Sequence, residues 1–207
     1  MQFDDSAAST LHDILRWRRD VRHFRTDAIP EPLIDALADA MALAPSVGNS
    51  RPWRVMRVRS ATRRAAVTEV FARCNAAAAE LYDDTERDTY LGLKLAGLRD
   101  APEHLAVFCV SDPMEGRGLG RQTMDETLAY SAAMAIHTLW LAARAINLGV
   151  GWVSILDPDE VCAILDAPDG WRFIGYLCLG YPASNDDTPL LHRAGWQENT
   201  KVSWIKR

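Results

Sequence analysis

The sequence is poor in the residues that cross-link small folds or hold metal ions. Its four cysteines among 207 residues show no C-x-x-C spacing, and most of them stand inside apolar runs. They are therefore expected to be free, buried thiols in a reducing compartment rather than disulfides. None of the five histidines falls into a metal-ligand pattern with another histidine, a cysteine or a carboxylate, so no metal site is expected.

A leader segment and an uninterrupted hydrophobic run are also missing. Residues 1–9 are polar and acidic, unlike a signal peptide. The most apolar stretch, residues 129–156, is interrupted by His137, Arg144 and Asn147, and such polar groups are costly inside a membrane. A buried helix followed by a strand explains this stretch better than a membrane span. We therefore expect a cytoplasmic protein with no membrane partner.

Positive charge is not in excess, since the formal net charge is -5. A general nucleic-acid binder is excluded on that ground, because such proteins carry a basic surface. Hydrophobic residues make up 48% of the chain, which is enough for one full core. Neither a repeat nor a linker divides the sequence. We expect a single domain over residues 1–207, with a polar tail at 1–9 and a flexible glycine-rich loop at 111–122.

Helical and strand patterns alternate along the chain, which favours an α+β layer structure. The Gly-x-Gly-x-Gly run at 116–120 has no strand–turn–helix unit around it, so it predicts a mobile loop rather than a dinucleotide site. Helices are predicted at about residues 11–17, 30–41, 61–98 (with a break near 83–84), 124–145 and from 157 onward, and strands at about 53–58, 105–110, 150–155 and 172–180.

Three arginines surround one aspartate just after the first predicted helix, in the run RRDVRHF at residues 18–24. Arginine is permanently charged and presents a planar fork of donors, which suits a phosphate group. Asp20 offers a carboxylate for proton transfer. A basic cluster at a helix end is also typical of a solvated face with salt bridges. The cluster alone leaves both interpretations open.

Two further motifs accompany this cluster, APSVGNSRPW at residues 44–53 and GVGWVSI at 149–155. In order and spacing the three motifs resemble the FMN-dependent nitroreductase superfamily, and within it the branch of 5,6-dimethylbenzimidazole synthases, the flavin destructases. The resemblance covers about residues 10–196. It is strengthened by LKLAG at 93–97, LWLAARA at 139–145 and YLCLGY at 176–181.

The resemblance implies a nitroreductase-like fold, with a central mixed or antiparallel sheet flanked by helices in an intertwined homodimer. The loop at residues 46–50 would reach the flavin of the neighbouring subunit. Arg18 and Arg19 would hold the ribityl phosphate, and Arg22 would face the pyrimidine edge of the ring. The FMN-binding set carried over by the resemblance is Arg18, Arg19, Asp20, Arg22, Pro45, Ser46, Val47, Asn49, Ser50, Asn75, Leu95, Val153 and Ser154.

Two positions indicate the destructase branch. Ordinary nitroreductases usually carry serine in place of Asp20 and an acidic or small polar residue near Ser154. The resemblance implies that Asp20 acts as acid or base and that Ser154 hydrogen-bonds near the redox nitrogen of the ring. The structural alternatives are an Asp20 that only pairs with an arginine and a Ser154 that only bonds backbone. Two departures from the family pattern are Arg51, where glutamine is frequent, and the absence of an arginine after Trp196.

The reaction implied is an O2-dependent fragmentation of reduced FMN to 5,6-dimethylbenzimidazole and erythrose 4-phosphate, a step toward the lower ligand of cobalamin. FMN would be the substrate, O2 the co-substrate, and a separate flavin reductase the source of reduced flavin. Closure of residues 82–98 and the glycine-rich loop would exclude water. The alternatives are an NAD(P)H-dependent nitroreductase that keeps its FMN and a flavin-binding or storage protein without catalysis.

Overall fold

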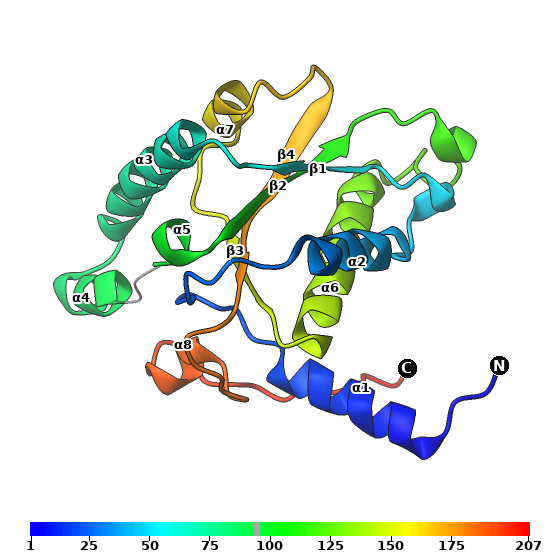
Figure 1. Cartoon of the computed structure of the whole chain (residues 1–207), viewed down its shortest axis with the longest axis horizontal. Coiled ribbons are helices and arrows are strands. Elements are labelled where there is room, and N and C mark those ends of the chain that lie inside the picture. The colour runs from blue at the N-terminus through cyan, green and yellow to red at the C-terminus, as the bar shows by residue number, and fades with distance from the viewer. Residues whose placement is uncertain (93–95) are drawn as a thin grey trace.

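A four-stranded antiparallel sheet forms the centre of the computed structural model, which describes residues 1–92 and 96–207 (Figure 1). All three pairs of neighbouring strands are antiparallel. The predicted α+β class with a central sheet is confirmed, and the strands pair only antiparallel to one another. The strands are β1 (Trp53–Arg57), β2 (Glu103–Val110), β3 (Gly149–Val153) and β4 (Trp171–Gly180), side by side in the order β1-β2-β4-β3.

Helices cover both faces of this sheet. They are α1 (Asp5–Trp17), α2 (Glu31–Ala42), α3 (Ala61–Ala79), α4 (Asp84–Gly92), α5 (Gly97–Asp100), α6 (Thr127–Ala145), α7 (Pro158–Ile164) and α8 (Leu190–Arg193), with short 3-10 turns η1 (Val47–Asn49) and η2 (Glu115–Gly118). Helices α2 and α6 lie on one side of the sheet, and α3 and α7 lie on the other (Figure 1). Across residues 1–92 and 96–207, no helix combines the length and the apolar character that crossing a membrane requires.

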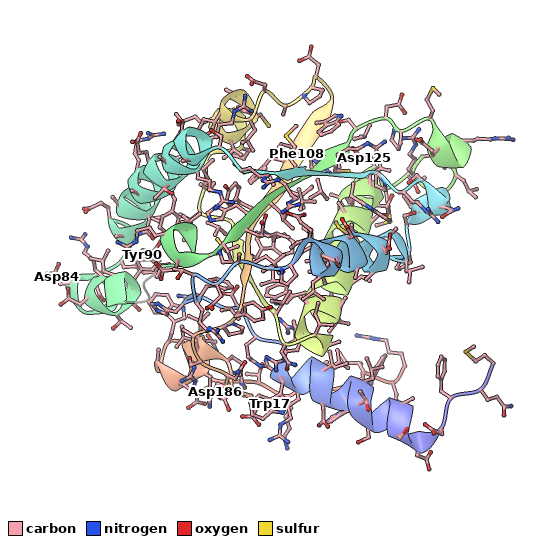
Figure 2. All side chains as sticks on the ribbon, viewed as in Figure 1. Trp17, Asp84, Tyr90, Phe108, Asp125 and Asp186 are labelled. Atoms are coloured by element: carbon pink, nitrogen blue, oxygen red, sulfur yellow. The ribbon has the colours of Figure 1, made fainter. Side chains whose placement is uncertain are left out.

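The central strands are buried on both faces, which explains their continuous apolar sequence. Along β2, Leu105 and Val107 pack with α2 and α6, whereas Ala106 and Phe108 pack with α3 and α7. Successive side chains of a strand point to opposite faces, so a strand covered on both sides must be apolar throughout. Side chains fill the space on either side of the sheet, Phe108 among them (Figure 2).

The first helix begins earlier than the sequence predicts. Its apolar spacing predicts a start at about residue 11, but α1 begins at Asp5, within the polar segment 1–9. The cause is an N-cap, because the Asp4 carboxylate accepts the backbone N–H of Ala7 at 3.1 Å and so satisfies one of the unpaired donors of the first turn. The polar residues of the predicted tail therefore form the first turns of a helix that leads into the arginine cluster.

The helix predicted over residues 61–98 is divided into α3, α4 and α5. The first interruption falls near residues 83–84, as the sequence predicts. There the Asp83 carboxylate accepts the backbone N–H of Glu86 at 2.9 Å and caps the first turn of α4. The predicted FMN-binding residue Leu95 lies outside the described residues.

The glycine-rich loop packs against the turn that follows α2. Gly48 and Gly116 meet where η1 and η2 touch, and a Cβ on Gly116 would lie 2.7 Å from the Gly48 carbonyl oxygen. Their φ angles are 57° and 74°, a conformation that glycine adopts readily. The segment 111–122, predicted as a flexible loop, therefore has a defined packing partner, and its glycines allow two backbones to approach closely.

A buried polar pair joins the two central strands. His104 on β2 is 1% exposed, and its Nδ1 lies 3.0 Å from the hydroxyl oxygen of Tyr176 on β4. Burial lowers the pKa of His104 to about 4, because a charged imidazolium would lose its hydration there. The other four histidines, which all fall within the described residues, are exposed. His104 is thus the histidine whose protonation opposes folding.

We predict that stability falls as the pH decreases from about 6.5 toward about 4. Below pH 6.5 the unfolded chain binds a proton at this histidine that the folded chain does not, so acid favours unfolding by up to about 3 kcal/mol. Denaturant unfolding at neutral and at mildly acidic pH measures this difference. The non-titrating variant His104→Gln should lose this part of the pH dependence, and an unchanged dependence would show that another group causes it.

Candidate functional site

After α1 the chain runs along the outer edge of β3. The backbone N–H of Val21 donates to the carbonyl oxygen of Val150 at 3.0 Å, and Asp20 pairs with Val150 in parallel orientation. Two glycines of β3 make room for this segment. A Cβ on Gly151 would lie 2.2 Å from the Val21 carbonyl oxygen, and one on Gly149 would lie 2.6 Å from Val21 Cγ2. The first and third sequence motifs therefore lie side by side.

Asp20 is held at this edge by a backbone donor and a cation. Its Oδ1 accepts the backbone N–H of Trp152 at 3.0 Å, and its Oδ2 lies 3.5 Å from Arg22 Nε. Although 38% of the side chain remains accessible, the surrounding protein removes much of its hydration. This burial raises the pKa of Asp20, and the Trp152 amide and the charges of Arg22 and Arg18 offset it only in part. The carboxyl group therefore keeps a proton more readily than an exposed aspartate does.

The two arginines before Asp20 have different surroundings. Arg19 turns back onto α1, where its Nε donates to the carbonyl oxygen of Arg16 at 2.9 Å and caps the helix end. Arg18 stacks on an indole instead, with its Cζ 4.9 Å from the centre of the Trp140 ring. Within the described residues its buried Nε has no hydrogen-bond partner. Of the two predicted phosphate ligands, Arg18 has the more available donors.

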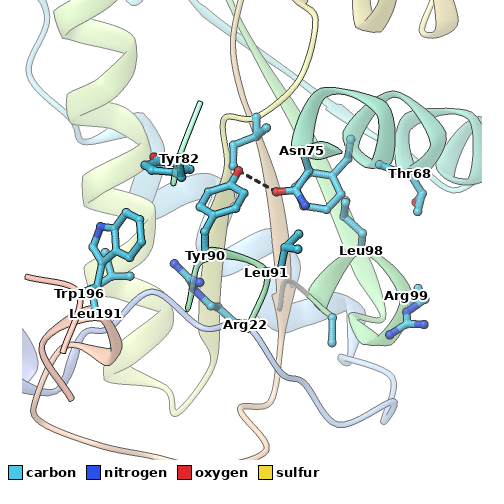
Figure 3. A pocket seen from close by; sticks show the side chains of 14 residues that line it. Arg22, Thr68, Asn75, Tyr82, Tyr90, Leu91, Leu98, Arg99, Leu191 and Trp196 are labelled. Atoms are coloured by element: carbon cyan, nitrogen blue, oxygen red, sulfur yellow. Dashed lines mark hydrogen bonds between the residues drawn. The ribbon is translucent and has the colours of Figure 1, made fainter. Parts of the chain in front are cut away.

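Three cavities adjoin the arginine cluster, and the smallest of them has a volume of only about 90 Å³. The smaller of the other two, of about 210 Å³, is lined by Arg18, Arg19, Asp20, Arg22 and residues 189–191. The larger, of about 490 Å³, lies among α3, α4, α5 and the segment around α8 (Figure 3). Arg22 lines both cavities. The larger one also takes in Asn75, another predicted FMN-binding residue.

Three aromatic side chains gather at the wall of the larger cavity. The ring centres of Tyr82 and Tyr90 are 4.9 Å apart, and Trp196 meets Tyr82 edge-on at 5.3 Å. The Tyr90 hydroxyl donates to Asn75 Oδ1 at 2.8 Å, as Figure 3 shows. The cluster joins α4 to the chain after α8. None of the three aromatic residues was predicted to bind the flavin, although two tyrosines beside a strongly charged helix were an available signal in the sequence.

Ser154 stands just beyond the end of β3. Val153, the last residue of the strand, is 1% exposed and packs in the core, whereas Ser154 is exposed. In the described part of the chain its hydroxyl makes no hydrogen bond, so the bond to backbone that was the structural alternative is not formed there. The neighbouring Ile155 lines the larger cavity. Asp20 pairs with Val150 near the start of β3, and its carboxylate reaches the Trp152 amide, whereas Ser154 follows the other end of the strand.

The predicted binding loop after α2 lies far in space from the arginine cluster of the same chain. Figure 1 shows it on the far side of the molecule from α4 and α8, so Pro45, Asn49 and their neighbours are not brought to the arginine cluster within one chain. Its conformation is fixed locally, because the Val47 N–H donates to Ser131 Oγ and the Arg51 N–H to Ser46 Oγ, each at 3.0 Å. Ser50 is 3% exposed.

No group of three or more histidine, cysteine, aspartate and glutamate side chains is placed to hold a metal ion in the portion of the chain that the structure describes. The polar groups that the structure places on or beside β3 include the Asp20 carboxyl group, the Ser154 hydroxyl group and the Arg22 guanidinium group. These are groups that bind anions and move protons.

We predict that Gly151→Ala destabilises the protein by on the order of 3 kcal/mol, because its new methyl group meets the Val21 backbone oxygen. In Gly149→Ala the new methyl group meets the Val21 side chain instead. Adding Val21→Ala should therefore recover part of the stability lost in Gly149→Ala, but little of the stability lost in Gly151→Ala. Chemical denaturation of the single and double variants measures both effects. A Gly151→Ala protein as stable as the wild type would contradict the close pairing of this segment with β3.

Comparison with known proteins identifies the family. The model of the nitroreductase family matches residues 15–181. The chain is 55% identical over 207 residues to a 5,6-dimethylbenzimidazole synthase of Rhodobacter capsulatus, with 100% of both chains covered. It is 52% identical over 205 residues to a 5,6-dimethylbenzimidazole synthase of Rhodospirillum rubrum, covering 99% of this chain and 97% of that one.

A solved structure with the same fold is that of oxidized iodotyrosine deiodinase bound to FMN and 3-iodo-L-tyrosine. It has a TM-score of 0.74 and 21% identity, and the match covers 95% of this chain and 97% of that one. These findings confirm the resemblance that the three motifs predict. The chain belongs to the nitroreductase family and, within it, to the group of the 5,6-dimethylbenzimidazole synthases.

Proposed function

We propose that this protein is a 5,6-dimethylbenzimidazole synthase that uses O2 to fragment reduced FMN into 5,6-dimethylbenzimidazole and erythrose 4-phosphate. The observation that carries the proposal is the Asp20 carboxyl group held on the Trp152 amide of β3, the strand that Ser154 follows, in a chain that matches synthases over its full length. FMN is a substrate in this reaction and supplies the ring carbons of the product.

The two cavities suit the two ends of FMN. The smaller cavity is lined by guanidinium groups. The buried Nε of Arg18, which has no hydrogen-bond partner among the described residues, is a donor that a phosphate oxygen would satisfy. The larger cavity has aromatic and aliphatic walls, which suit a flat ring system. Arg22 lies between them, where a cation stabilises negative charge on the pyrimidine end of the reduced ring.

Asp20 is assigned the acid and base role. Its Oδ1 is fixed by the Trp152 amide, while its Oδ2 faces Arg22 and the small cavity. The raised pKa brings the carboxyl group closer to neutral pH, where a group that both accepts and releases a proton is most effective. Ser154, exposed and without a side-chain bond among the described residues, is assigned the hydrogen bond near the redox nitrogen of the ring.

A second copy of the chain completes the proposed site. Because the loop at 46–50 lies away from the arginine cluster within one chain, we assign it to the site of the neighbouring subunit in a homodimer. Helix α6 offers an apolar surface for such an interface, since Tyr130 and Met134 are 52% and 40% exposed and stand one helical turn apart. Reduced FMN is proposed to come from a separate flavin reductase.

A single turnover under defined oxygen tests this function. The protein is loaded with anaerobically reduced FMN, air is admitted, and the products are separated by chromatography with mass detection. We expect 5,6-dimethylbenzimidazole from the wild type. Asp20→Asn should lower its rate of formation by on the order of 100-fold or more, because a positioned proton donor or acceptor is lost. Ser154→Ala should divert the reaction toward intact oxidised FMN.

The matched control is Asp27→Asn, which removes an exposed carboxylate paired only with Arg25 among the described residues and should leave product formation unchanged. Quantitative recovery of oxidised FMN from the wild type would reject the synthase. Rapid oxidation of NAD(P)H by the protein alone would then identify a nitroreductase. Stoichiometric flavin binding with neither activity would identify a flavin-binding protein.

A further inference from the structure

We propose that Trp140 of α6 is a positioning residue for the phosphate end of the flavin site. Its indole holds the Arg18 guanidinium by stacking and holds the backbone next to Asp20 by a hydrogen bond. The inference rests on the proposed function only in taking a flavin phosphate as the ligand. It does not require the fragmentation reaction.

Trp140 makes two different contacts with the arginine cluster. The Arg18 Cζ lies 4.9 Å from the centre of the Trp140 ring, which is within the range of a cation–π interaction. The Trp140 Nε1–H donates to the carbonyl oxygen of Arg19 at 3.3 Å. One contact orients a side chain, and the other fixes the peptide group that immediately precedes Asp20.

The stacking contact leaves the hydrogen-bonding edge of Arg18 available. A carboxylate partner would use the guanidinium donors and neutralise the charge, as Asp187 does for Arg16 and Glu160 does for Arg73. An indole face attracts the cation without accepting its in-plane N–H groups. Within residues 1–92 and 96–207, Arg18 has no ion pair and its buried Nε has no hydrogen-bond partner.

A buried guanidinium donor without a partner is costly, because it has lost its hydrogen bonds to water. An anion in the adjoining cavity of about 210 Å³ would remove that cost, because Arg18 lines this cavity together with Asp20 and Arg22. A phosphate group matches the planar fork of arginine and the size of the space. The orientation of Arg18 on the indole therefore prepares it for a phosphate.

Trp140 is itself held by the second tryptophan of the site. The two ring centres are 6.4 Å apart at an interplanar angle of 46°. The Trp152 ring is seated against β4 at Gly175, where a Cβ would lie 2.2 Å from the Trp152 Nε1. The Trp152 backbone amide also binds the Asp20 carboxylate. The two tryptophans therefore connect the Arg18 guanidinium group to the Asp20 carboxyl group.

The test compares the binding of oxidised FMN and riboflavin, which differ only in the phosphate. Isothermal titration calorimetry gives the ratio of the two Kd values for each variant. We expect the wild type to prefer FMN, and Trp140→Leu to lower that preference by about tenfold because Arg18 loses its support. Trp140→Phe keeps an aromatic face and should keep most of the preference. Trp171→Leu, which removes an indole packed on Phe108, is the matched control and should leave the ratio unchanged.

A double-mutant cycle keeps the inference testable if Trp140→Leu does not fold. Arg18→Lys retains the charge but loses the planar group that stacks, and Trp140→Met fills the site of the indole with a flexible apolar chain that has no aromatic face. The losses of FMN preference in Arg18→Lys and Trp140→Met should be less than additive when combined. Additive losses would overturn the inference. So would a Trp140→Leu variant that binds both flavins more weakly by the same factor, since that indicates a structural role only.

The outcomes also separate this inference from the proposed function. A wild type that prefers FMN, loses that preference in Trp140→Leu and yet forms no 5,6-dimethylbenzimidazole would support the positioning role and reject the synthase. A wild type that forms the product but binds riboflavin as tightly as FMN would support the synthase and overturn the positioning role.

Discussion

The pairing of Asp20 and Val21 with the outer edge of β3 is the contact on which the whole site depends. A strand edge exposes unpaired N–H and C=O groups. Here the segment after α1 satisfies them, through the Val21 amide on the Val150 carbonyl and the Asp20 carboxylate on the Trp152 amide. The arginines flank Asp20 in the sequence, so the same contact decides where they stand. Two cavities, one carboxyl group and several cations are thus placed by a single short run of backbone.

The walls of the larger cavity combine segments from both ends of the chain. Arg22 comes from the N-terminal segment, Tyr82 and Tyr90 come from the region of α4, and Trp196 follows α8. Their aromatic contacts place apolar surface beside the Arg22 guanidinium group. Fewer water molecules reach such surroundings, so charged groups interact more strongly with one another there than in solution.

Much of this architecture can be predicted from the sequence, because several local patterns are compatible with only one arrangement of the backbone. A strand as apolar as β2 must be covered on both faces, and GVG in β3 permits a close backbone approach that larger residues forbid. Other features depend on geometry that no local pattern shows. Arg18 and Arg19 have the same chemistry, yet one stacks on an indole and the other caps α1. The aromatic cluster was missed because its members meet only after distant segments have packed together.

The distance in sequence between partners also has a consequence for how the protein folds. Asp20 and Trp152 are separated by 132 positions, and Trp140 and Arg19 by 121. Closing such long loops loses much chain entropy before any contact is gained, so these contacts form late compared with helices and hairpins. During synthesis the arginine cluster leaves the ribosome first but has no strand to pair with until β3 has followed. The site therefore takes shape as one of the last events of folding, when the sheet that supports it is already in place.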